Sequence, residues 1–353
     1  MTKTSVIPVL VAALVLAVGC GSGTTPTGNQ SPATCGGTST SCLALVTVRG
    51  SDQLVVRDIT DIANPKTEAN LGPNVVPVFV SATEVSYPSD AGLVRAPFAG
   101  SPKTVVTSQA VGLFAWSPDG RTVVYTVESP AGLDVHQLTG GVDRILGSSP
   151  RGGGGGCESI AGCAIANSVD FRLAYSRDGA YVSLVINGFA PSSFRLWSSD
   201  GKLLRSNDSQ GTTMSVWSGG SLYFRDAAGV QVWRDGAVST FLAGVTWIRP
   251  SASPDGKAIV YAARDSSGWA HTYIVDIATK KVRELNMARS EPVFLTSRYI
   301  WYRGERECVE ADNCGVNPPL HPASGKTYIY DLQGGTETES AITSVYDVWP
   351  HAA

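Results

Sequence analysis

Residues Trp116-Ser117-Pro118-Asp119-Gly120-Arg121-Thr122-Val123-Val124-Tyr125 decide the fold of this chain. They contain the aromatic end of one apolar strand, a tight turn and the start of a second strand. Pro118 sets φ near about −65°, Asp119 can bond its own backbone, and Gly120 accepts a positive φ without steric cost. The stretch therefore predicts two antiparallel strands joined by a short turn.

The same unit recurs twice along the chain. Tyr175-Ser176-Arg177-Asp178-Gly179 precedes the apolar run 180–185, and Ser253-Pro254-Asp255-Gly256 precedes the run 257–261. Recurrence of one supersecondary unit predicts a repeat architecture. Short runs rich in Val, Thr, Tyr and Trp between the copies are typical of strands, and beyond the N-terminus no long apolar run has helical periodicity. We expect many strands and few helices.

The two ends of the repeated region complement each other. Residues 43–48 and 54–57 have the pattern of the second and third strands of a four-stranded unit that lacks its first strand. Residues 345–350 have the pattern of a first strand with nothing after it, and Trp349 takes the place of Trp116. We predict that this C-terminal strand completes the first unit and closes a ring, which removes open sheet edges. The expected fold is an all-β propeller of seven four-stranded blades, with six or eight as alternatives.

The Ser-Pro-Asp-Gly turns between inner strands carry a family resemblance. Over residues 42–350 the chain resembles the TolB-like and WD-repeat-like β-propellers, although sharp motifs occur in three blades only. The resemblance implies a role in envelope maintenance or scaffolding. It does not imply membership of a Tol–Pal-type complex, because the separate N-terminal domain of TolB proteins has no counterpart in the sequence. We expect the aromatic residues that end the first strands to pack between blades: Trp116, Tyr175, Trp217 and Trp349.

The N-terminus has the pattern of an export signal. Residues 1–19 contain Lys3, a short apolar run and small residues before Cys20, which is typical of a signal peptide and too short for a comfortable transmembrane helix. The segment resembles a lipoprotein lipobox, with Ala17 where the family usually has Leu, so we expect lipid attachment at Cys20; an ordinary cleaved signal is the alternative. Residues 20–41 are rich in Gly, Ser, Thr and Pro and predict a flexible tether. The expected protein is exported, anchored to a membrane and facing the periplasm or the cell exterior.

Six further cysteines form three close couples. An even set at short spacing in an exported protein predicts disulfides. Zinc would require Cys-x-x-Cys couples or nearby His, and neither occurs, so we expect no metal and no other cofactor. The couples are Cys35 with Cys42, Cys157 with Cys163, and Cys308 with Cys314.

Two long connections interrupt the repeat, and each contains a cysteine couple. Segment 151–166 would join the last strand of the third blade to the first strand of the fourth; segment 303–324 would join two strands of the seventh. Such connections leave a four-stranded meander on the same face, so both loops would form one partner-facing surface remote from the tether. The alternative is that they are insertions stapled against proteolysis. Candidate partner-binding residues are Arg151, Glu158, Arg303, Arg306, Glu307, Glu310, Asp312, Asn313 and His321.

Charge and missing motifs restrict the function classes. The net charge of −3 is spread along the chain, which argues against nucleic acid as a partner because that would require a basic face. Gly-x-Ser-x-Gly is absent, so no nucleophile elbow is present. We predict a non-catalytic extracytoplasmic lipoprotein that binds a protein or envelope component. The alternatives are a carbohydrate- or peptidoglycan-binding propeller, and an envelope hydrolase or lactonase-type enzyme using channel residues among Asp170, Arg172, Arg249, Glu291 and Asp347.

Overall fold

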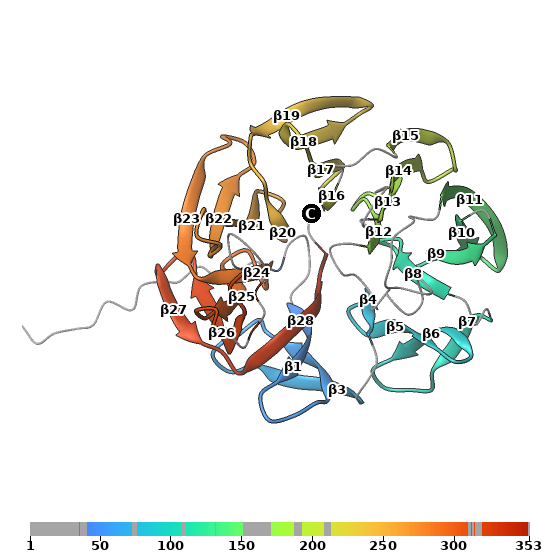
Figure 1. Ribbon diagram of the computed structural model, residues 1–353. Helices are drawn as coiled ribbons and strands as arrows, with labels where there is room; N and C mark the ends of the chain where they lie inside the picture. The colour runs from blue at the N-terminus through green and yellow to red at the C-terminus, as the bar shows by residue number, and fades with distance from the viewer. Residues whose placement is uncertain are drawn as a thin grey trace, which may run out of the picture. The chain divides into compact units, whose positions relative to one another are not determined.

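The computed structural model is an all-β propeller of seven four-stranded antiparallel sheets arranged in a ring (Figure 1). No α-helix occurs in the described part of the chain. All described residues beyond the N-terminal 32 belong to one compact unit, Ala33–Ala353. The structure describes residues 35, 41–72, 76–107, 111–130, 132–150, 171–186, 193–207, 213–309, 312, 314 and 320–351.

Each blade is a meander whose strands we letter A to D from the centre outward. Blade 1 consists of β28 (Ile342–Trp349), β1 (Leu43–Val48), β2 (Leu54–Asp58) and β3 (Lys66–Gly72). Blade 2 consists of β4 (Val78–Ser81), β5 (Glu84–Ser89), β6 (Gly92–Pro97) and β7 (Lys103–Val106). Blade 3 consists of β8 (Val111–Trp116), β9 (Thr122–Ser129), β10 (Gly132–Thr139) and β11 (Val142–Pro150). Blade 4 consists of β12 (Phe171–Tyr175), β13 (Tyr181–Ile186), β14 (Ser193–Ser198) and β15 (Leu203–Asn207).

The remaining blades repeat this order. Blade 5 consists of β16 (Thr213–Ser218), β17 (Ser221–Asp226), β18 (Gly229–Arg234) and β19 (Ala237–Ala243). Blade 6 consists of β20 (Ile248–Ala252), β21 (Ala258–Arg264), β22 (Ala270–Asp276) and β23 (Val282–Met287). Blade 7 consists of β24 (Arg289–Phe294), β25 (Tyr299–Glu305), β26 (Ala323–Asp331) and β27 (Thr336–Glu339).

The C-terminal strand closes the ring as predicted. β28 is the A strand of blade 1 and pairs antiparallel with β1, with Leu43 opposite Trp349 and Thr47 opposite Ser344. The prediction of seven blades is also confirmed. Closure leaves every A strand facing the centre and every B strand flanked on both sides.

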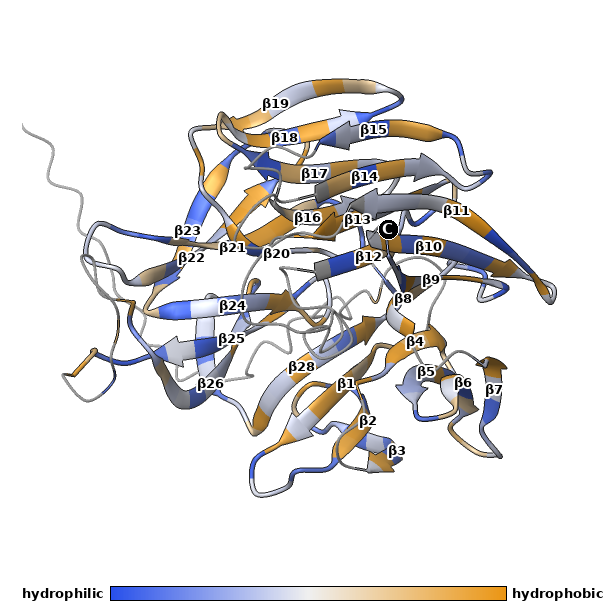
Figure 2. Cartoon of the chain, turned by 45° about the vertical axis from the view of Figure 1, so that its right-hand side comes forward, coloured by the Kyte–Doolittle hydropathy of each residue, from blue (hydrophilic) through white to orange (hydrophobic). Residues whose placement is uncertain are grey.

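The core is divided into one apolar cluster at each boundary between neighbouring blades. Strands B and C supply most of it: in blade 1, β1 and β2 are largely buried whereas β3 is largely exposed, and Figure 2 shows β1 and β2 mostly in apolar colours. Three indoles also bridge blades, since Trp217 Nε1 donates to Ser183 Oγ, Trp247 Nε1 to the Met214 carbonyl and Trp301 Nε1 to the Ile342 carbonyl, each at 2.9 Å. Burial of apolar area at every boundary holds the blades together.

The repeated turns act as predicted, as structural devices. The serine hydroxyl donates to the aspartate carboxylate at 2.6 Å from Ser117 to Asp119, and the same bond recurs from Ser176 to Asp178 and from Ser253 to Asp255. The hydrogen bond from Ser117 lowers the pKa of Asp119. The glycine that follows has a positive φ of 65° at Gly120, a conformation that glycine adopts without steric cost. These carboxylates belong to the A–B turns and have no catalytic arrangement.

Alternation of the meander gives the disc two distinct faces. The A–B and C–D turns lie on one face, which we call the A–B face. The B–C and D–A connections lie on the other, which we call the B–C face. Cys42 directly precedes β1, a B strand, and therefore lies on the A–B face.

Candidate functional site

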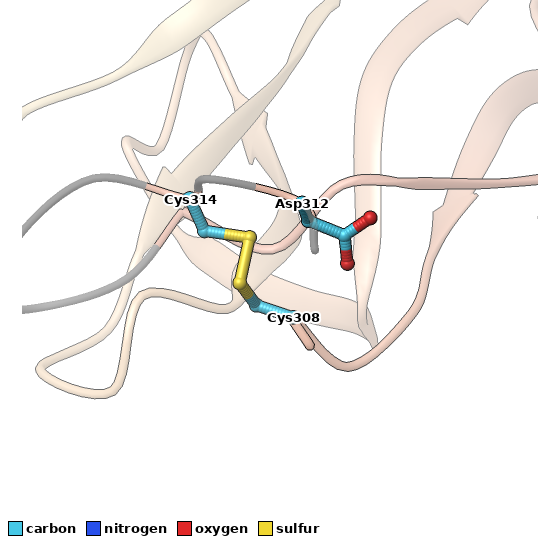
Figure 3. A group of neighbouring side chains, drawn as sticks. All are labelled: Cys308, Asp312 and Cys314. Carbon is cyan, nitrogen blue, oxygen red and sulfur yellow. A yellow bond between two sulfur atoms is a disulfide. The ribbon is translucent and has the colours of Figure 1, made fainter. Parts of the chain in front are cut away.

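The longest connection whose ends the structure describes is residues 306–322, between β25 and β26 of blade 7. It follows a B strand and therefore leaves from the B–C face. A disulfide joins Cys308 to Cys314 with a Cα–Cα distance of 6.2 Å (Figure 3). We call this connection the stapled loop. The Cys35–Cys42 disulfide is also present, whereas Cys157, Cys163 and Cys20 lie outside the described residues.

A charge pair reinforces the staple. Arg306 binds the Asp312 carboxylate in a two-point contact, Nη1 to Oδ2 and Nη2 to Oδ1, each at 2.6 Å. The backbone N–H of Val309 donates to the same carboxylate at 2.9 Å. The hydrogen bonds from Arg306 lower the pKa of Asp312 to about 2. Asp312 therefore stays ionised over the physiological pH range and ties together Arg306 and Val309.

Cys308, Asp312 and Cys314 are close enough to suggest a metal site, since their potential ligand atoms lie within 4.8 Å of one another. Thiolates bind metals, but these two sulfur atoms are bonded to each other. Figure 3 shows the Asp312 carboxylate pointing away from the disulfide, and Arg306 occupies both of its oxygens. The trio is a structural staple.

His321 fastens the stapled loop to the neighbouring blade. Its Nδ1 accepts the backbone N–H of Cys308 at 3.1 Å, which makes Nε2 the donor to the Ser267 carbonyl at 3.3 Å. Its ring stacks on Trp269, with centroids 3.6 Å apart and planes at 10°. Ser267 and Trp269 belong to the B–C turn of blade 6, so the loop leans on a second blade. Only 8% of His321 is exposed, and its ring is committed to these internal contacts.

The outward surface of the stapled loop is apolar and acidic. Val309 and Leu320 are 53% and 55% exposed, and Glu307 is also exposed. These three residues are the exposed side chains that a partner on the B–C face could reach first.

The centre of the ring encloses a second candidate site, a channel with a volume of about 880 Å³. The A strands of all seven blades contribute to its wall. Four of the five predicted channel residues line it: Arg172, Arg249, Glu291 and Asp347. The fifth, Asp170, lies outside the described residues.

Glu291 lies between two guanidinium groups. Its Oε1 is 3.2 Å from Arg249 Nη1, and its Oε2 is 3.0 Å from Arg303 Nε. Arg303 Nη2 also donates to Ser344 Oγ at 2.9 Å. Although predicted as a loop residue, Arg303 lies near the end of β25 and lines the channel.

Backbone bulges place this group. The A–B register shifts between Ile248 and Ser251 in blade 6 and between Ser290 and Val293 in blade 7. Within these bulges Arg249 has a φ of 48° and Glu291 a φ of 55°. Non-glycine residues seldom adopt this left-handed conformation, and bulges redirect side chains. The fold therefore maintains local strain where two opposite charges enter the channel.

A second polar group spans the channel mouth on the A–B face. The Asp347 carboxylate accepts the Phe79 backbone N–H at 2.8 Å and lies 3.0 Å from His351 Nε2. Burial alone would lower the pKa of His351, but Asp347 outweighs it and the net direction is upward. Arg177, in the A–B turn of blade 4, donates to the His351 carbonyl. The described C-terminal segment thus reaches from blade 1 to blade 4, and Figure 1 shows β28 running along the inner side of the ring.

Arg172 has fewer partners than its neighbours. Its Nη1 donates to the Ser215 carbonyl at 3.0 Å, and in the described part of the chain no carboxylate forms an ion pair with it. Burial lowers the pKa of both Arg172 and Arg177. The guanidinium nevertheless remains charged in proteins, so the described guanidinium groups of the channel wall outnumber its described carboxylates.

No family model matches the sequence, and the curated proteins contain no significant match. Solved structures do match. TolB from Acinetobacter baumannii has 15% identity and a TM-score of 0.48; the match covers 87% of this chain and 65% of that one. This chain and the matched structures share the propeller fold, which has seven blades in this chain.

Propellers of other proteins match this chain with TM-scores in the same range. A structure from a study of two prolyl endopeptidases has 12% identity and a TM-score of 0.53, covering 86% of this chain and 50% of that one. The propeller domain of the trilobed protease from Pyrococcus furiosus has 11% identity and a TM-score of 0.48, covering 75% and 82%. That propeller is described as having an open velcro topology, whereas β28 closes the ring in this chain. Likeness at these identities shows the fold alone.

The predicted aromatic residues both pack and border the channel. Trp116, Tyr175, Trp217 and Trp349 belong to the clusters between blades, and all four contribute to the channel wall. Among the predicted loop residues, Arg306, Glu307, Asp312 and His321 belong to the stapled loop. Arg151, Glu158, Glu310 and Asn313 lie outside the described residues.

Sequence reasoning missed Arg177, His351 and Trp269. One signal could have identified Arg177, because it stands where the other two copies of the turn have Pro118 and Pro254. A departure from the chain's own repeat at an inner turn points toward the channel. No described helix is both long and apolar enough to cross a bilayer.

Proposed function

We propose that this chain is a non-catalytic extracytoplasmic lipoprotein that serves as a binding scaffold, with a protein or envelope partner on the B–C face. The stapled loop is the proposed contact surface. The observation that carries the proposal is its construction: a disulfide, an Arg306–Asp312 pair and the His321 contacts fix a loop that exposes Val309 and Leu320. A loop ordered before binding loses less conformational entropy on binding.

The place where the N-terminal segment joins the propeller supports a stapled loop that faces away from the membrane. Cys35 is buried and disulfide-bonded to Cys42, which lies on the A–B face at the start of β1. The stapled loop leaves from the end of β25 on the opposite face. A tether attached before Cys35 would therefore leave the stapled loop free of the membrane side. The two disulfides are compatible with export to an oxidising compartment.

Site-specific photo-crosslinking tests the proposed surface. A photo-crosslinking amino acid replaces Glu307, and the full chain is expressed in its native envelope. We expect discrete adducts that disappear in the Val309→Ser/Leu320→Ser variant. The matched control is Val142→Ser/Ile145→Ser on the outer strand β11, whose side chains are 70% and 60% exposed. Adducts unaffected by the loop substitutions, or lost equally in the control, would reject the stapled loop as the contact surface.

Fractionation tests the tether separately. Cys20→Ala should move the chain from the membrane fraction to the soluble extracytoplasmic fraction, because one acylated cysteine supplies the anchor. An unchanged membrane fraction would show that another feature holds the protein there.

A further inference from the structure

The central channel is lined by two kinds of side chain, which we call its apolar wall and its charged wall; the blades that supply them alternate in part around the ring, since blade 4 lies between blades 3 and 5. Blades 2, 3 and 5 contribute apolar and aromatic side chains, among them Phe79, Phe114 and Trp217. Blades 4, 6, 7 and 1 contribute the charged groups already described. A ligand that fits both walls must combine an apolar body with a charged end.

The charged wall favours an anion. Four guanidinium groups line the channel, from Arg172, Arg177, Arg249 and Arg303, and the described carboxylates there are those of Glu291 and Asp347. The chain as a whole has a net charge of −3. Positive charge is therefore concentrated in the channel of an acidic protein, where low-dielectric walls strengthen its field.

The pairing inside the channel leaves capacity for a further acceptor. Glu291 is shared by Arg249 and Arg303, so two guanidiniums have one carboxylate between them. The Arg172 guanidinium donates to a neutral carbonyl. Arg172 is partly buried, and an incoming carboxylate would give its guanidinium a charged acceptor through charge-assisted hydrogen bonds.

The chain's own C-terminal segment illustrates the chemistry that the channel mouth accepts. Arg177 donates to the backbone carbonyl of His351, and the His351 imidazole bonds Asp347. The side chain of the preceding Trp349 packs beside Phe79, with ring centroids 6.4 Å apart. An oxygen acceptor on a guanidinium and an aromatic body on the apolar wall thus already occur together at one end of the channel.

We propose that the channel binds a carboxylate attached to an apolar body, with Arg172, Arg249 and Arg303 facing the carboxylate and the aromatic residues of blades 2, 3 and 5 facing the body. This site is distinct from the stapled loop and does not depend on the partner proposed there.

The test uses two probes that differ in one group. N-acetyl-phenylalanine and its carboxamide are titrated into the purified full chain by isothermal titration calorimetry, and inorganic phosphate serves as an oxyanion without an apolar body. We expect the acid to bind at least about tenfold more tightly than the amide, the usual effect of a charged hydrogen bond, and to bind more weakly as salt concentration rises. Equal binding of acid and amide would overturn the proposal. Phosphate binding as tight as that of the acid would overturn the role of the apolar wall.

Variants then place the site. Arg172→Gln and Arg249→Gln should each weaken acid binding about tenfold or more and leave amide binding unchanged. Arg283→Gln, on the exposed outer strand β23, is the matched control and should bind as the wild type. Acid affinity unchanged in both channel variants would overturn the assignment. Because the acid–amide comparison uses the unaltered chain, the proposal stays testable even if a channel variant fails to fold.

Discussion

The stapled loop and the central channel differ in how far apart in sequence their residues lie. The loop is assembled from residues close in sequence: its staple spans 6 positions and its charge pair also 6. The channel is assembled from A strands distributed over the whole chain, and Arg172 and Asp347 both line it because the ring closes. The loop can therefore change without disturbing the fold, whereas the channel cannot.

This difference also separates how the two regions are held. The stapled loop relies on a covalent bond, a salt bridge and one stacked ring at the edge of the disc. The channel relies on apolar clusters between all neighbouring blades. Substitutions in the loop should accordingly act locally, whereas changes to the ring should act on the whole fold.

Removal of residues 342–353 should have the largest effect. It deletes β28, exposes the unpaired edge of β1 and uncovers the cluster between blades 7 and 1. Since loss of even one large core side chain costs about 3–5 kcal/mol, we expect loss of the cooperative thermal transition by circular dichroism. A chain ending at His351 is the control and should melt as the wild type. A truncated chain with an unchanged transition would show that the ring does not need its closing strand.

His321→Ala should loosen the stapled loop and spare the ring. The substitution removes the stack on Trp269 and leaves the Cys308 N–H without its acceptor, a local cost of about 2–3 kcal/mol. We expect faster amide exchange and proteolysis within 306–322 with an almost unchanged melting temperature. His136→Ala on strand β10 is a matched control. A clear fall in the melting temperature of the whole chain would contradict this prediction. It would mean that the loop and the ring unfold as one cooperative unit.

Replacing both cysteines of the staple, Cys308→Ser with Cys314→Ser, should have a smaller effect. The bond closes a short loop, so its contribution is at most about 2 kcal/mol. The Arg306–Asp312 pair and His321 remain, and we expect the loop to stay ordered while its protease resistance falls several-fold. The variant with Cys35→Ser and Cys42→Ser, which keeps the Cys308–Cys314 bond, is the control and should retain the protease resistance of the stapled loop. Equal protease resistance with and without the bond would assign the order of the loop to its other contacts.

The smallest expected effect is a pH dependence of the folding stability, caused by His271 near the turn that contacts the stapled loop. His271 contacts Glu284 at 2.8 Å and Asp265 at 3.1 Å, and Asp265 holds the turn that carries Trp269. Burial alone would lower the pKa of His271, but the two carboxylates outweigh it and the net shift is upward. A raised folded-state pKa gives a stabilisation that is complete below the unfolded value of about 6.5 and is lost as pH rises through the folded value.

Urea unfolding of wild type and His271→Gln between pH 5.5 and 8.5 measures this effect. The stability difference in favour of the wild type should be largest at acidic pH and shrink toward alkaline pH. A difference that stays constant, or that grows with pH, would contradict an upward shift of the His271 pKa.

Much of the fold follows from the sequence, because turn chemistry and strand alternation are local signals. The turn at 117–120 and its copies locate the inner strands, and the orphan strand pattern at 345–350 predicts ring closure. The A-strand bulges do not follow in the same way, since nothing in the local sequence requires a positive φ at Arg249 or Glu291. Their conformations are imposed by register against the B strand and by packing across blades.

The candidate site is predictable only in part, for the same reason. Cysteine spacing identifies the stapled loop, whereas the contact between His321 and Trp269 joins two blades and leaves no sequence pattern. The structure buries the His321 ring in internal contacts, while its assignment as a partner-binding residue stays a prediction. Spacing also places Arg303 in the loop, but the strand continues through Glu305 and carries the Arg303 side chain to the channel.

The pairing of the last strand with the first has a consequence for biosynthesis. Translation delivers β28 after every other strand, so a nascent chain carries six finished blades before the first blade can be completed. A stop codon just ahead of this strand would therefore be nearly as damaging as one much earlier in the gene. A purification tag fused after His351 would emerge beside Arg177 at the mouth of the channel, so an N-terminal fusion is the better choice for ligand studies.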